Sequence, residues 1–194
     1  EVVEDSSEQA AGITYDNHRW TVTVAVPADF STPTVTYSRE DGITSTIGAE
    51  FTNSEENKET EITLEGTKSL SGRTLKDGEF TFEVKDKAGK VVATGSNKSD
   101  GSISFNNKLN YKLSDLEKAD GSYESEKTYE YTVNEVIPEG ATAENNYTVN
   151  GVTYDSKTVN VKVTVTYNKE TGELKAELAK DSEAIAFQNS YDTE

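Results

Sequence analysis

The stretch YEYTVNEVIPEG, residues 129–140, alternates with a period of two, which is typical of a half-buried β-strand. Its apolar face is interrupted at Glu135 and otherwise carries Tyr129, Tyr131, Val133 and Ile137. An unpaired carboxylate is costly to bury, because it loses its hydration and gains no partner in return. We therefore expect Glu135 to be neutralised or paired inside the fold.

The same alternation recurs along the chain and predicts an almost wholly β protein. It is seen in the segments 20–26, 62–64, 80–84, 103–105 and 159–167. Turn signals separate these segments, such as KDGE (76–79), SDGS (99–102) and NKETGE (168–173). Many short strands joined by regular turns are typical of an all-β sandwich.

The composition limits the possible partners and chemistry. The 194 residues include 36 acidic and 19 basic side chains, and the formal net charge of -17 would repel nucleic acid and anionic membranes. No segment is apolar enough for membrane insertion, and no signal peptide is recognisable. Cys is absent, which excludes disulfides, and no metal-ligand cluster is evident, so we expect neither metal nor cofactor. Met is also absent, which suggests a processed or excised fragment.

The chain repeats itself imperfectly, which predicts two related modules. Three motifs return in the same order: GITYD (12–16) as GVTYD (151–155), TVTYSREDG (34–42) as TVTYNKETG (164–172), and FTNS (51–54) as FQNS (187–190). We therefore interpret residues 1–53 as the C-terminal part of a preceding repeat, 54–60 as a linker, and 61–191 as a complete domain. A short match of EVVED (1–5) with EVIPE (135–139) would place Glu1 opposite Glu135.

Two further polar residues fall on apolar strand faces, as Glu135 does. Lys68 shares its face with Ile62, Leu64 and Leu70, and Asn189 shares its face with Ile185, Phe187 and Tyr191. Each has an ordinary alternative, since an edge-strand lysine can snorkel and an asparagine can cap a strand end. Three such residues facing one core would be costly unless they satisfied one another.

These residues lie in motifs that together resemble the streptococcal pilin isopeptide-linkage domain. The motifs are TKSLSGRTLKDGEFTF (67–82), YEYTVNE (129–135), GVTYD (151–155) and FQNSY (187–191). The family supplies repeats of backbone pilins and surface adhesins of Gram-positive bacteria and is related to the B-type stalk domains of collagen adhesins. The resemblance implies an immunoglobulin-like two-sheet β-sandwich with a self-formed amide bond between Lys68 and Asn189, assisted by the acid Glu135.

The chemistry of such a bond accounts for these residue types. Burial disfavours the lysine ammonium and yields a nucleophilic amine, while a neutral glutamic acid can polarise the asparagine carbonyl and move a proton to departing ammonia. Glu135 would then act once, on its own chain, so we do not expect an enzyme for external substrates. Closing so long a loop would stabilise the module by about 5 kcal/mol in the chain-entropy model.

Residues 1–53 depart from the family pattern. Asn53 matches Asn189, but no lysine-bearing strand precedes it, so we expect no Asn53 cross-link within this chain. Half a sandwich is expected to leave Trp20, Val22 and Val24 exposed. Missing upstream sequence or another polypeptide would complete the module; the alternative is a self-sufficient small β-domain.

The resemblance favours a structural stalk or pilus-shaft module, cell-wall-anchored on the extracellular surface of a Gram-positive bacterium. Its expected partners are neighbouring repeats or pilin subunits, with a host ligand as a further option. The alternative function is a ligand-binding adhesin module, for which Tyr123, Tyr147 and Tyr154 near loops are candidates. A hydrolase with paired carboxylates is the least favoured class, because proximity among 36 acids cannot be inferred from sequence.

Overall fold

The computed structural model describes residues 1–5, 13–29, 31–55 and 58–192. The chain divides into two compact units. The N-terminal unit comprises residues 1–57 together with 117–123, and the C-terminal unit comprises 58–116 and 124–194. Among the described residues, helix is limited to two short 3-10 turns, η1 (Leu113–Leu116) and η2 (Ala143–Asn145). The prediction of an all-β sandwich is confirmed.

The C-terminal unit is built around one ten-stranded sheet, in the hydrogen-bonding order β13-β14-β17-β7-β10-β9-β8-β12-β15-β16. A separate pair joins β6 and β11. The bounds are β6 (Glu59–Ile62), β7 (Glu65–Ser71), β8 (Thr81–Asp86), β9 (Val91–Asn97), β10 (Ser102–Phe105), β11 (Leu109–Lys112), β12 (Glu126–Glu135), β13 (Thr148–Val149), β14 (Val152–Thr153), β15 (Thr158–Asn168), β16 (Glu173–Leu178) and β17 (Ala186–Tyr191).

The core of this unit follows from the period-two pattern of its strands. In β15, alternate residues are buried: Val159, Val161, Val163, Val165 and Tyr167. Phe82 of β8 and Phe187 of β17 are both buried and stack with ring centroids 5.1 Å apart. Because β8 and β17 are not neighbours in the sheet order, this contact crosses the core, as expected when two layers face each other.

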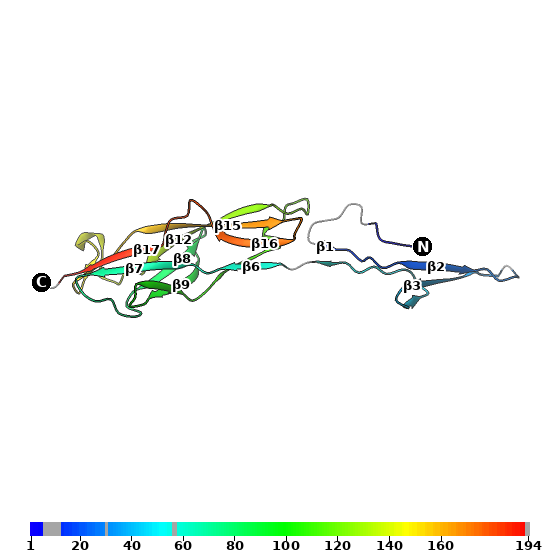
Figure 1. Ribbon diagram of the computed structural model, residues 1–194, viewed down its shortest axis with the longest axis horizontal. Coiled ribbons are helices and arrows are strands. Elements are labelled where there is room, and N and C mark those ends of the chain that lie inside the picture. The colour runs from blue at the N-terminus through cyan, green and yellow to red at the C-terminus, as the bar shows by residue number, and fades with distance from the viewer. Residues whose placement is uncertain (6–12, 30, 56–57, 193–194) are drawn as a thin grey trace. The chain divides into compact units, whose positions relative to one another are not determined.

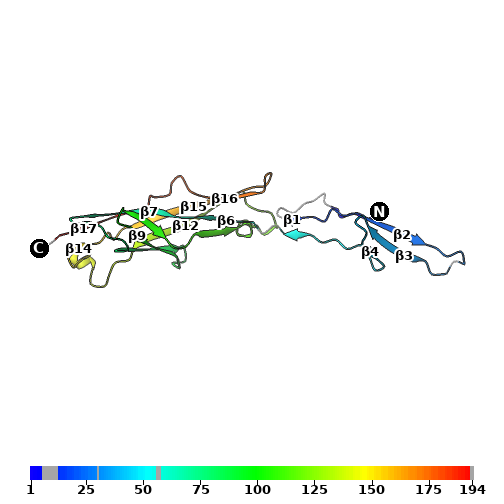
Figure 2. The same ribbon diagram turned by 60° about the horizontal axis from the view of Figure 1, so that its bottom comes forward.

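The first and last long strands of the unit, β7 and β17, lie side by side (Figure 1) and pair in parallel. Figure 2 shows the same unit turned by 60°. The strands approach closely at Gly72, which directly follows β7 and has φ +89°, a conformation that glycine adopts readily. A Cβ atom at Gly72 would lie 1.9 Å from the carbonyl oxygen of Tyr191, so glycine is required where the two strands leave the sheet together.

The N-terminal unit contains the short strands β1 (Ile13–Thr14), β2 (Trp20–Ala25), β3 (Thr34–Arg39), β4 (Thr44–Ser45) and β5 (Ser54–Glu55). The expectation that Trp20 is exposed is wrong, since only 2% of this residue is accessible. Its indole Nε1–H donates to the carbonyl oxygen of Glu50 at 3.2 Å, and the Arg39 guanidinium lies 5.8 Å from its ring. Val24 is 57% exposed, as expected, and Val22 is half-buried.

Two details of the sequence interpretation change in the structure. Both ends of the segment interpreted as a linker, 54–60, are strands: β5 pairs with β1, and β6 begins at Glu59 and pairs with β11; residues 56–57 lie outside the described residues. The match of 34–42 with 164–172 is wrong as a structural equivalence. β3 pairs with β2 in the N-terminal unit, and β16 pairs with β15 in the C-terminal unit. Residues 34–39 therefore correspond to β16, whereas residues 164–168 belong to β15.

Candidate functional site

Three strands bring Lys68, Glu135 and Asn189 together in the core of the C-terminal unit. Lys68 lies in the middle of β7 and Asn189 in the neighbouring β17. Each is buried between two exposed polar residues, Thr67 and Ser69 in β7 and Gln188 and Ser190 in β17. Glu135 is the last residue of β12, which β10, β9 and β8 separate from β7 in the sheet order. The sheet therefore folds back on itself, and Glu135 reaches Lys68 across the core rather than along the sheet.

The Glu135 carboxylate bridges the other two side chains. The Lys68 ammonium Nζ donates to Glu135 Oε2 at 2.8 Å, and the Asn189 amide Nδ2 donates to Glu135 Oε1 at 2.7 Å. The side chains of Lys68 and Glu135 are fully inaccessible to solvent. Lys68 Nζ also lies 4.5 Å from the ring centroid of Phe80 and 5.9 Å from that of Phe82, so aromatic rings replace water around the amine.

Burial shifts both ionisable groups of this site towards their neutral forms. Desolvation lowers the pKa of Lys68, against the opposing effect of the contact with Glu135. Desolvation likewise raises the pKa of Glu135, although the hydrogen bond from Lys68 opposes the shift. The arrangement can therefore hold a neutral amine beside a neutral carboxylic acid, which is the pair that nucleophilic attack and proton transfer require.

Asp155 orients the asparagine from the opposite side. The Asp155 backbone N–H donates to Asn189 Oδ1 at 2.9 Å; because a backbone N–H can only donate, this contact identifies the asparagine oxygen. The Asp155 carboxylate accepts from the backbone N–H of Gln188 at 2.9 Å and of Lys157 at 3.2 Å. Burial alone would raise the pKa of Asp155, but these backbone donors lower it. Through these hydrogen bonds, Asp155 connects β17 to the residue just before β15.

Sequence reasoning assigned no role to Asp155, and it assigned the polarisation of the carbonyl to Glu135. The structure instead places Glu135 on the amide nitrogen and the Asp155 N–H on the oxygen of Asn189. A signal for Asp155 was available, since the aspartate of GVTYD recurs as Asp16 in GITYD.

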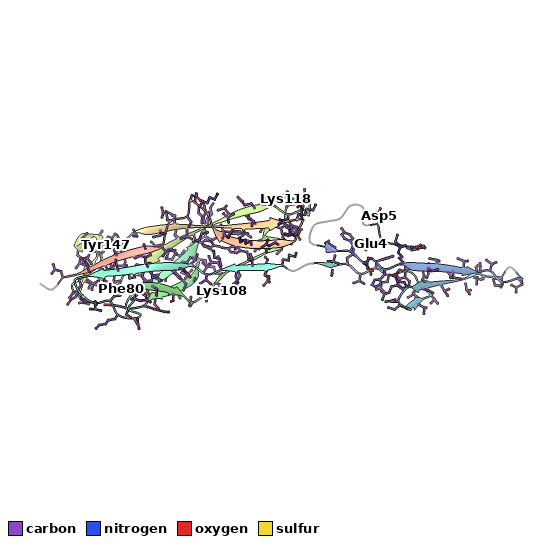
Figure 3. All side chains as sticks on the ribbon, viewed as in Figure 1. Glu4, Asp5, Phe80, Lys108, Lys118 and Tyr147 are labelled. Atoms are coloured by element: carbon purple, nitrogen blue, oxygen red, sulfur yellow. The ribbon has the colours of Figure 1, made fainter. Side chains whose placement is uncertain are left out.

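Asn53 belongs to the N-terminal unit and contacts a different glutamate. Its amide Nδ2 donates to Glu4 Oε1 at 2.7 Å (Glu4 is labelled in Figure 3). The expectation that Glu1 is the counterpart of Glu135 is wrong, because Glu1 lies on the surface and pairs with Arg19 at 2.7 Å. The strand register favours Glu4, since Val2 pairs with Trp20 as Val133 pairs with Val159.

The tyrosines considered for ligand binding, Tyr123, Tyr147 and Tyr154, belong to two different units. Tyr154 packs edge-on against Phe80, with ring centroids 5.8 Å apart, and its backbone N–H donates to the carbonyl oxygen of Tyr147 at 3.0 Å. Tyr123 belongs to the other unit, where it pairs with Glu117.

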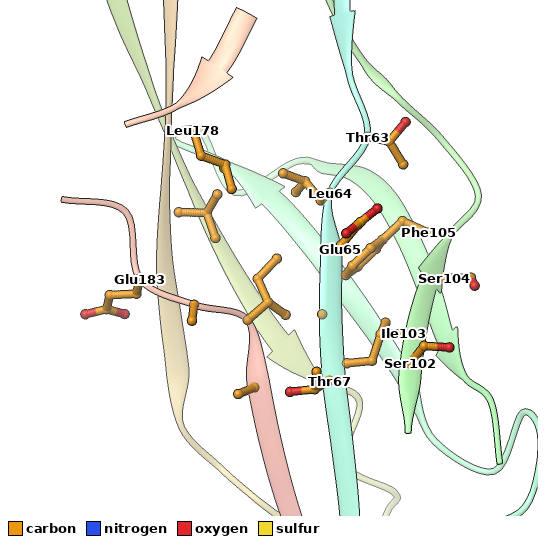
Figure 4. Close-up of a pocket in the computed structure, with 15 residues that line it drawn as sticks. Thr63, Leu64, Glu65, Thr67, Ser102, Ile103, Ser104, Phe105, Leu178 and Glu183 are labelled. Atoms are coloured by element: carbon orange, nitrogen blue, oxygen red, sulfur yellow. The ribbon is translucent and has the colours of Figure 1, made fainter. Parts of the chain in front are cut away.

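A shallow groove of about 810 Å³ lies elsewhere on the C-terminal unit (Figure 4). Its walls come from β7 and the residues just before it, from β10, from the end of β16 and from the residues just before β17. They include Leu64, Ile103, Phe105, Leu178 and Ile185. Lys68, Glu135 and Asn189 do not line it. Across residues 1–5, 13–29, 31–55 and 58–192, no cluster of three His, Asp or Glu side chains could hold a metal ion, and no helix has the length and apolarity to cross a membrane.

Comparison with known proteins gives a family match over the C-terminal unit. Residues 64–192 match the family FctA, described as a Spy0128-like isopeptide containing domain. A solved structure of the major pilin protein (T-13) from Streptococcus pyogenes is similar at 20% sequence identity and a TM-score of 0.33. The match covers 70% of this chain and 54% of the pilin chain, so this chain spans about half the length of that pilin. No curated protein matches the chain.

Proposed function

This chain belongs to the FctA family of Spy0128-like isopeptide-containing domains, and we propose that its C-terminal unit cross-links itself through an amide bond between Lys68 and Asn189. The observation that carries the proposal is the continuous buried contact from Lys68 Nζ through the Glu135 carboxylate to Asn189 Nδ2. The Glu135 carboxylate accepts hydrogen bonds from both the attacking nitrogen and the leaving nitrogen of the proposed condensation.

The reaction begins with transfer of the ammonium proton from Lys68 to Glu135, which leaves a neutral amine and a neutral acid. The amine Nζ attacks Cγ of Asn189, and negative charge develops on Oδ1. The Asp155 N–H, 2.9 Å from that oxygen, stabilises the charge as an oxyanion-hole donor does.

Collapse of this intermediate breaks the bond between Cγ and Nδ2. Glu135, 2.7 Å from Nδ2, gives its proton to the leaving nitrogen and takes a proton from the attacking amine, so that the carboxyl group is restored. The products are one secondary amide and one ammonia, with no change in oxidation state. Because the paired strands hold amine and amide in place, the effective concentration of the reactants is high. Glu135 turns over once and only on its own chain, so the protein is not an enzyme in the ordinary sense.

The position of the bond suits a structural module that bears force. β7 and β17 are adjacent and parallel, so tension that enters before β7 and leaves after β17 loads this strand pair in shear. An amide between Lys68 and Asn189 would carry that load covalently. We therefore propose a stalk or pilus-shaft module of a surface protein, extracellular and cell-wall-anchored on a Gram-positive bacterium, with neighbouring repeats or pilin subunits as partners.

Intact mass spectrometry of the purified chain tests the proposal. We expect a mass below the sequence mass by one ammonia, and the calculated mass for Lys68→Ala and for Asn189→Ala. Asn53→Ala is the matched control, since it removes an asparagine from the other unit and should keep the deficit of the wild type. A wild-type mass equal to the calculated value would refute the cross-link.

A further inference from the structure

An ammonium group contacts the residue that holds the asparagine oxygen. Lys157 directly precedes β15, and its side-chain Nζ lies 3.3 Å from Asp155 Oδ2. The backbone N–H of Lys157 donates to the other oxygen of the same carboxylate, Asp155 Oδ1, at 3.2 Å. Lys157 therefore binds one carboxylate through both its backbone and its side chain.

The same ammonium lies beside the strands that carry the reacting groups. Lys157 Nζ is 5.4 Å from the ring centroid of Phe187, the residue that pairs with Lys68 in the parallel register of β7 and β17. The side chain of Lys157 is 46% exposed, whereas that of Lys68 is fully inaccessible. A hydrated cation thus lies at the border of a site whose own amine has to lose its charge.

Asp155 brings an unfavourable charge to the reaction as well as a hydrogen-bond donor. Its N–H donates to Asn189 Oδ1 at 2.9 Å, and its carboxylate accepts from the N–H of Gln188, the residue before that asparagine, at 2.9 Å. The proposed attack places negative charge on Oδ1, and a nearby carboxylate repels that charge. Only 15% of the Asp155 side chain is accessible, so solvent and salt screen the repulsion weakly.

The charge of Asp155 also acts on the nucleophile. Desolvation is the largest cause of the lowered pKa of Lys68; the Asp155 carboxylate opposes this shift, and the Lys157 ammonium adds to it. A carboxylate without its counter-ion would therefore hold more of Lys68 in the ammonium form, which cannot attack. A cation beside Asp155 favours both the neutral amine and the negative oxygen of the intermediate.

The N-terminal unit repeats this arrangement with a different basic residue. His18 follows Asp16 by two positions, as Lys157 follows Asp155, and the two aspartates end the repeated motifs GITYD and GVTYD. The His18 backbone N–H donates to Asp16 Oδ1 at 2.9 Å, and His18 Nδ1 lies 2.5 Å from the same oxygen. In both units, one residue binds the carboxylate through its backbone N–H and a basic side chain. This recurrence indicates that the contact belongs to the motif and is not an isolated surface ion pair.

We propose that Lys157 is a positioning residue for the cross-link: its ammonium neutralises the Asp155 carboxylate, so that negative charge can develop on the oxygen of Asn189. This inference rests on the proposed function, and it adds no covalent step, because Lys157 exchanges no proton and is not part of the product. Lys157 thus affects the rate at which the bond forms and does not affect the pairing of the strands.

The rate of ammonia loss tests this role. The chain is made by cell-free synthesis and arrested in denaturing acid at timed intervals, and intact mass gives the fraction that has lost one ammonia. Lys157→Met keeps the aliphatic stem near Phe187 but removes the charge, so it should slow the loss by about fivefold, the upper range for one partly exposed ion pair. Lys157→Arg keeps the charge and should react as the wild type does. A wild-type rate in Lys157→Met, or an equally slow Lys157→Arg, would overturn the proposal.

Lys162→Met is the matched control. Lys162 also pairs with an aspartate, Asp181, at 2.5 Å, but this aspartate makes no hydrogen bond to Asn189 among the described contacts, so the rate should not change. In the Lys68→Ala background, which forms no bond, the two methionine variants should have the same thermal midpoint. A lower midpoint for Lys157→Met alone would assign its slower reaction to folding and overturn the electrostatic role.

The charge of Asp155 provides a second test. Asp155→Asn leaves no carboxylate to neutralise, so adding Lys157→Met should not slow the reaction further. Equal slowing in both backgrounds would show that the lysine acts through packing and would overturn its role as a counter-ion. A wild type that keeps its full calculated mass would refute the Lys68–Asn189 bond itself, whereas ammonia loss at one rate in the wild type and Lys157→Met would refute this inference alone.

Discussion

Lys68 lies opposite Phe187 in the parallel pairing of β7 with β17, two residues before Asn189 on the neighbouring strand. Residues two apart on a strand point to the same face, so the lysine and the asparagine both face the core while Glu135 meets them from β12. The reacting groups thus come from the first and last long strands of the unit, and the acid comes from the opposite layer. Chemistry at this point would join two strands that 121 positions of sequence separate.

Glu135→Gln should give a folded protein without the ammonia loss. Glutamine keeps the shape of the side chain but has no acidic proton to transfer, so the amine is not activated and the leaving group is not protonated. Loss of a stabilisation of about 5 kcal/mol should lower the thermal midpoint by more than about 10 °C, to near that of Lys68→Ala. Calorimetry and intact mass together measure both effects.

The matched control is Glu130→Gln, an exposed position of the same strand, which should keep both the bond and the midpoint. Ammonia loss in Glu135→Gln would show that another acid serves the reaction.

Much of this site is predictable from sequence because the direction of a side chain on a strand depends on the period of two alone. That period placed Lys68, Glu135 and Asn189 on inward faces without knowledge of the pairing. The contact between Asp155 and Asn189 could not be predicted in this way, because it depends on a loop between β14 and β15 that has no period.

In the N-terminal unit, too, strand periodicity does not predict contacts between distant segments. EVVED contains two glutamates, and only the pairing of Val2 with Trp20 selects Glu4 over Glu1. Trp20 was predicted to be exposed because its strand lacks a second sheet, but the chain near Glu50 returns to accept its indole N–H. Tertiary contacts of this kind leave no trace in local periodicity.

Asp155 should make the module sensitive to acid. Its pKa in the folded protein lies below the ordinary value of 3.8, so its stabilising contribution is fully present above that value and is lost as the pH falls through the lower, folded-state value. We expect the wild type to be more stable than Asp155→Asn at neutral pH and the difference to shrink towards zero in strong acid. Thermal melts of both proteins between neutral and strongly acidic pH measure it, and a difference independent of pH would contradict the role of the charge.

Gly72→Ala should destabilise the C-terminal unit far more than Gly78→Ala. Both glycines have a positive φ, +89° and +67°, so both substitutions carry a backbone cost of about 1 kcal/mol. Only at Gly72 would the new Cβ meet backbone, 1.9 Å from the Tyr191 carbonyl oxygen, whereas at Gly78 nothing lies within 4 Å. Urea unfolding in the Lys68→Ala background measures the free energy of unfolding of both variants. Equal losses of stability would show that the backbone at Gly72 does not lie as close to Tyr191 as the structure has it.

Single-molecule stretching from the two termini should separate a force-bearing module from an ordinary one. In the wild type the covalent path shields residues 68–189, so only the N-terminal unit and the flanking residues should extend, by about 200 Å for 57 residues. In Lys68→Ala the parallel pair β7–β17 is held by hydrogen bonds alone, and its rupture should release a further length of about 400 Å. Asn53→Ala is the control, because it leaves the Lys68–Asn189 pair intact and should stretch as the wild type does. An unfolding event of about 400 Å in the cross-linked wild type would mean that force bypasses the amide, and the stalk function would lose its physical basis.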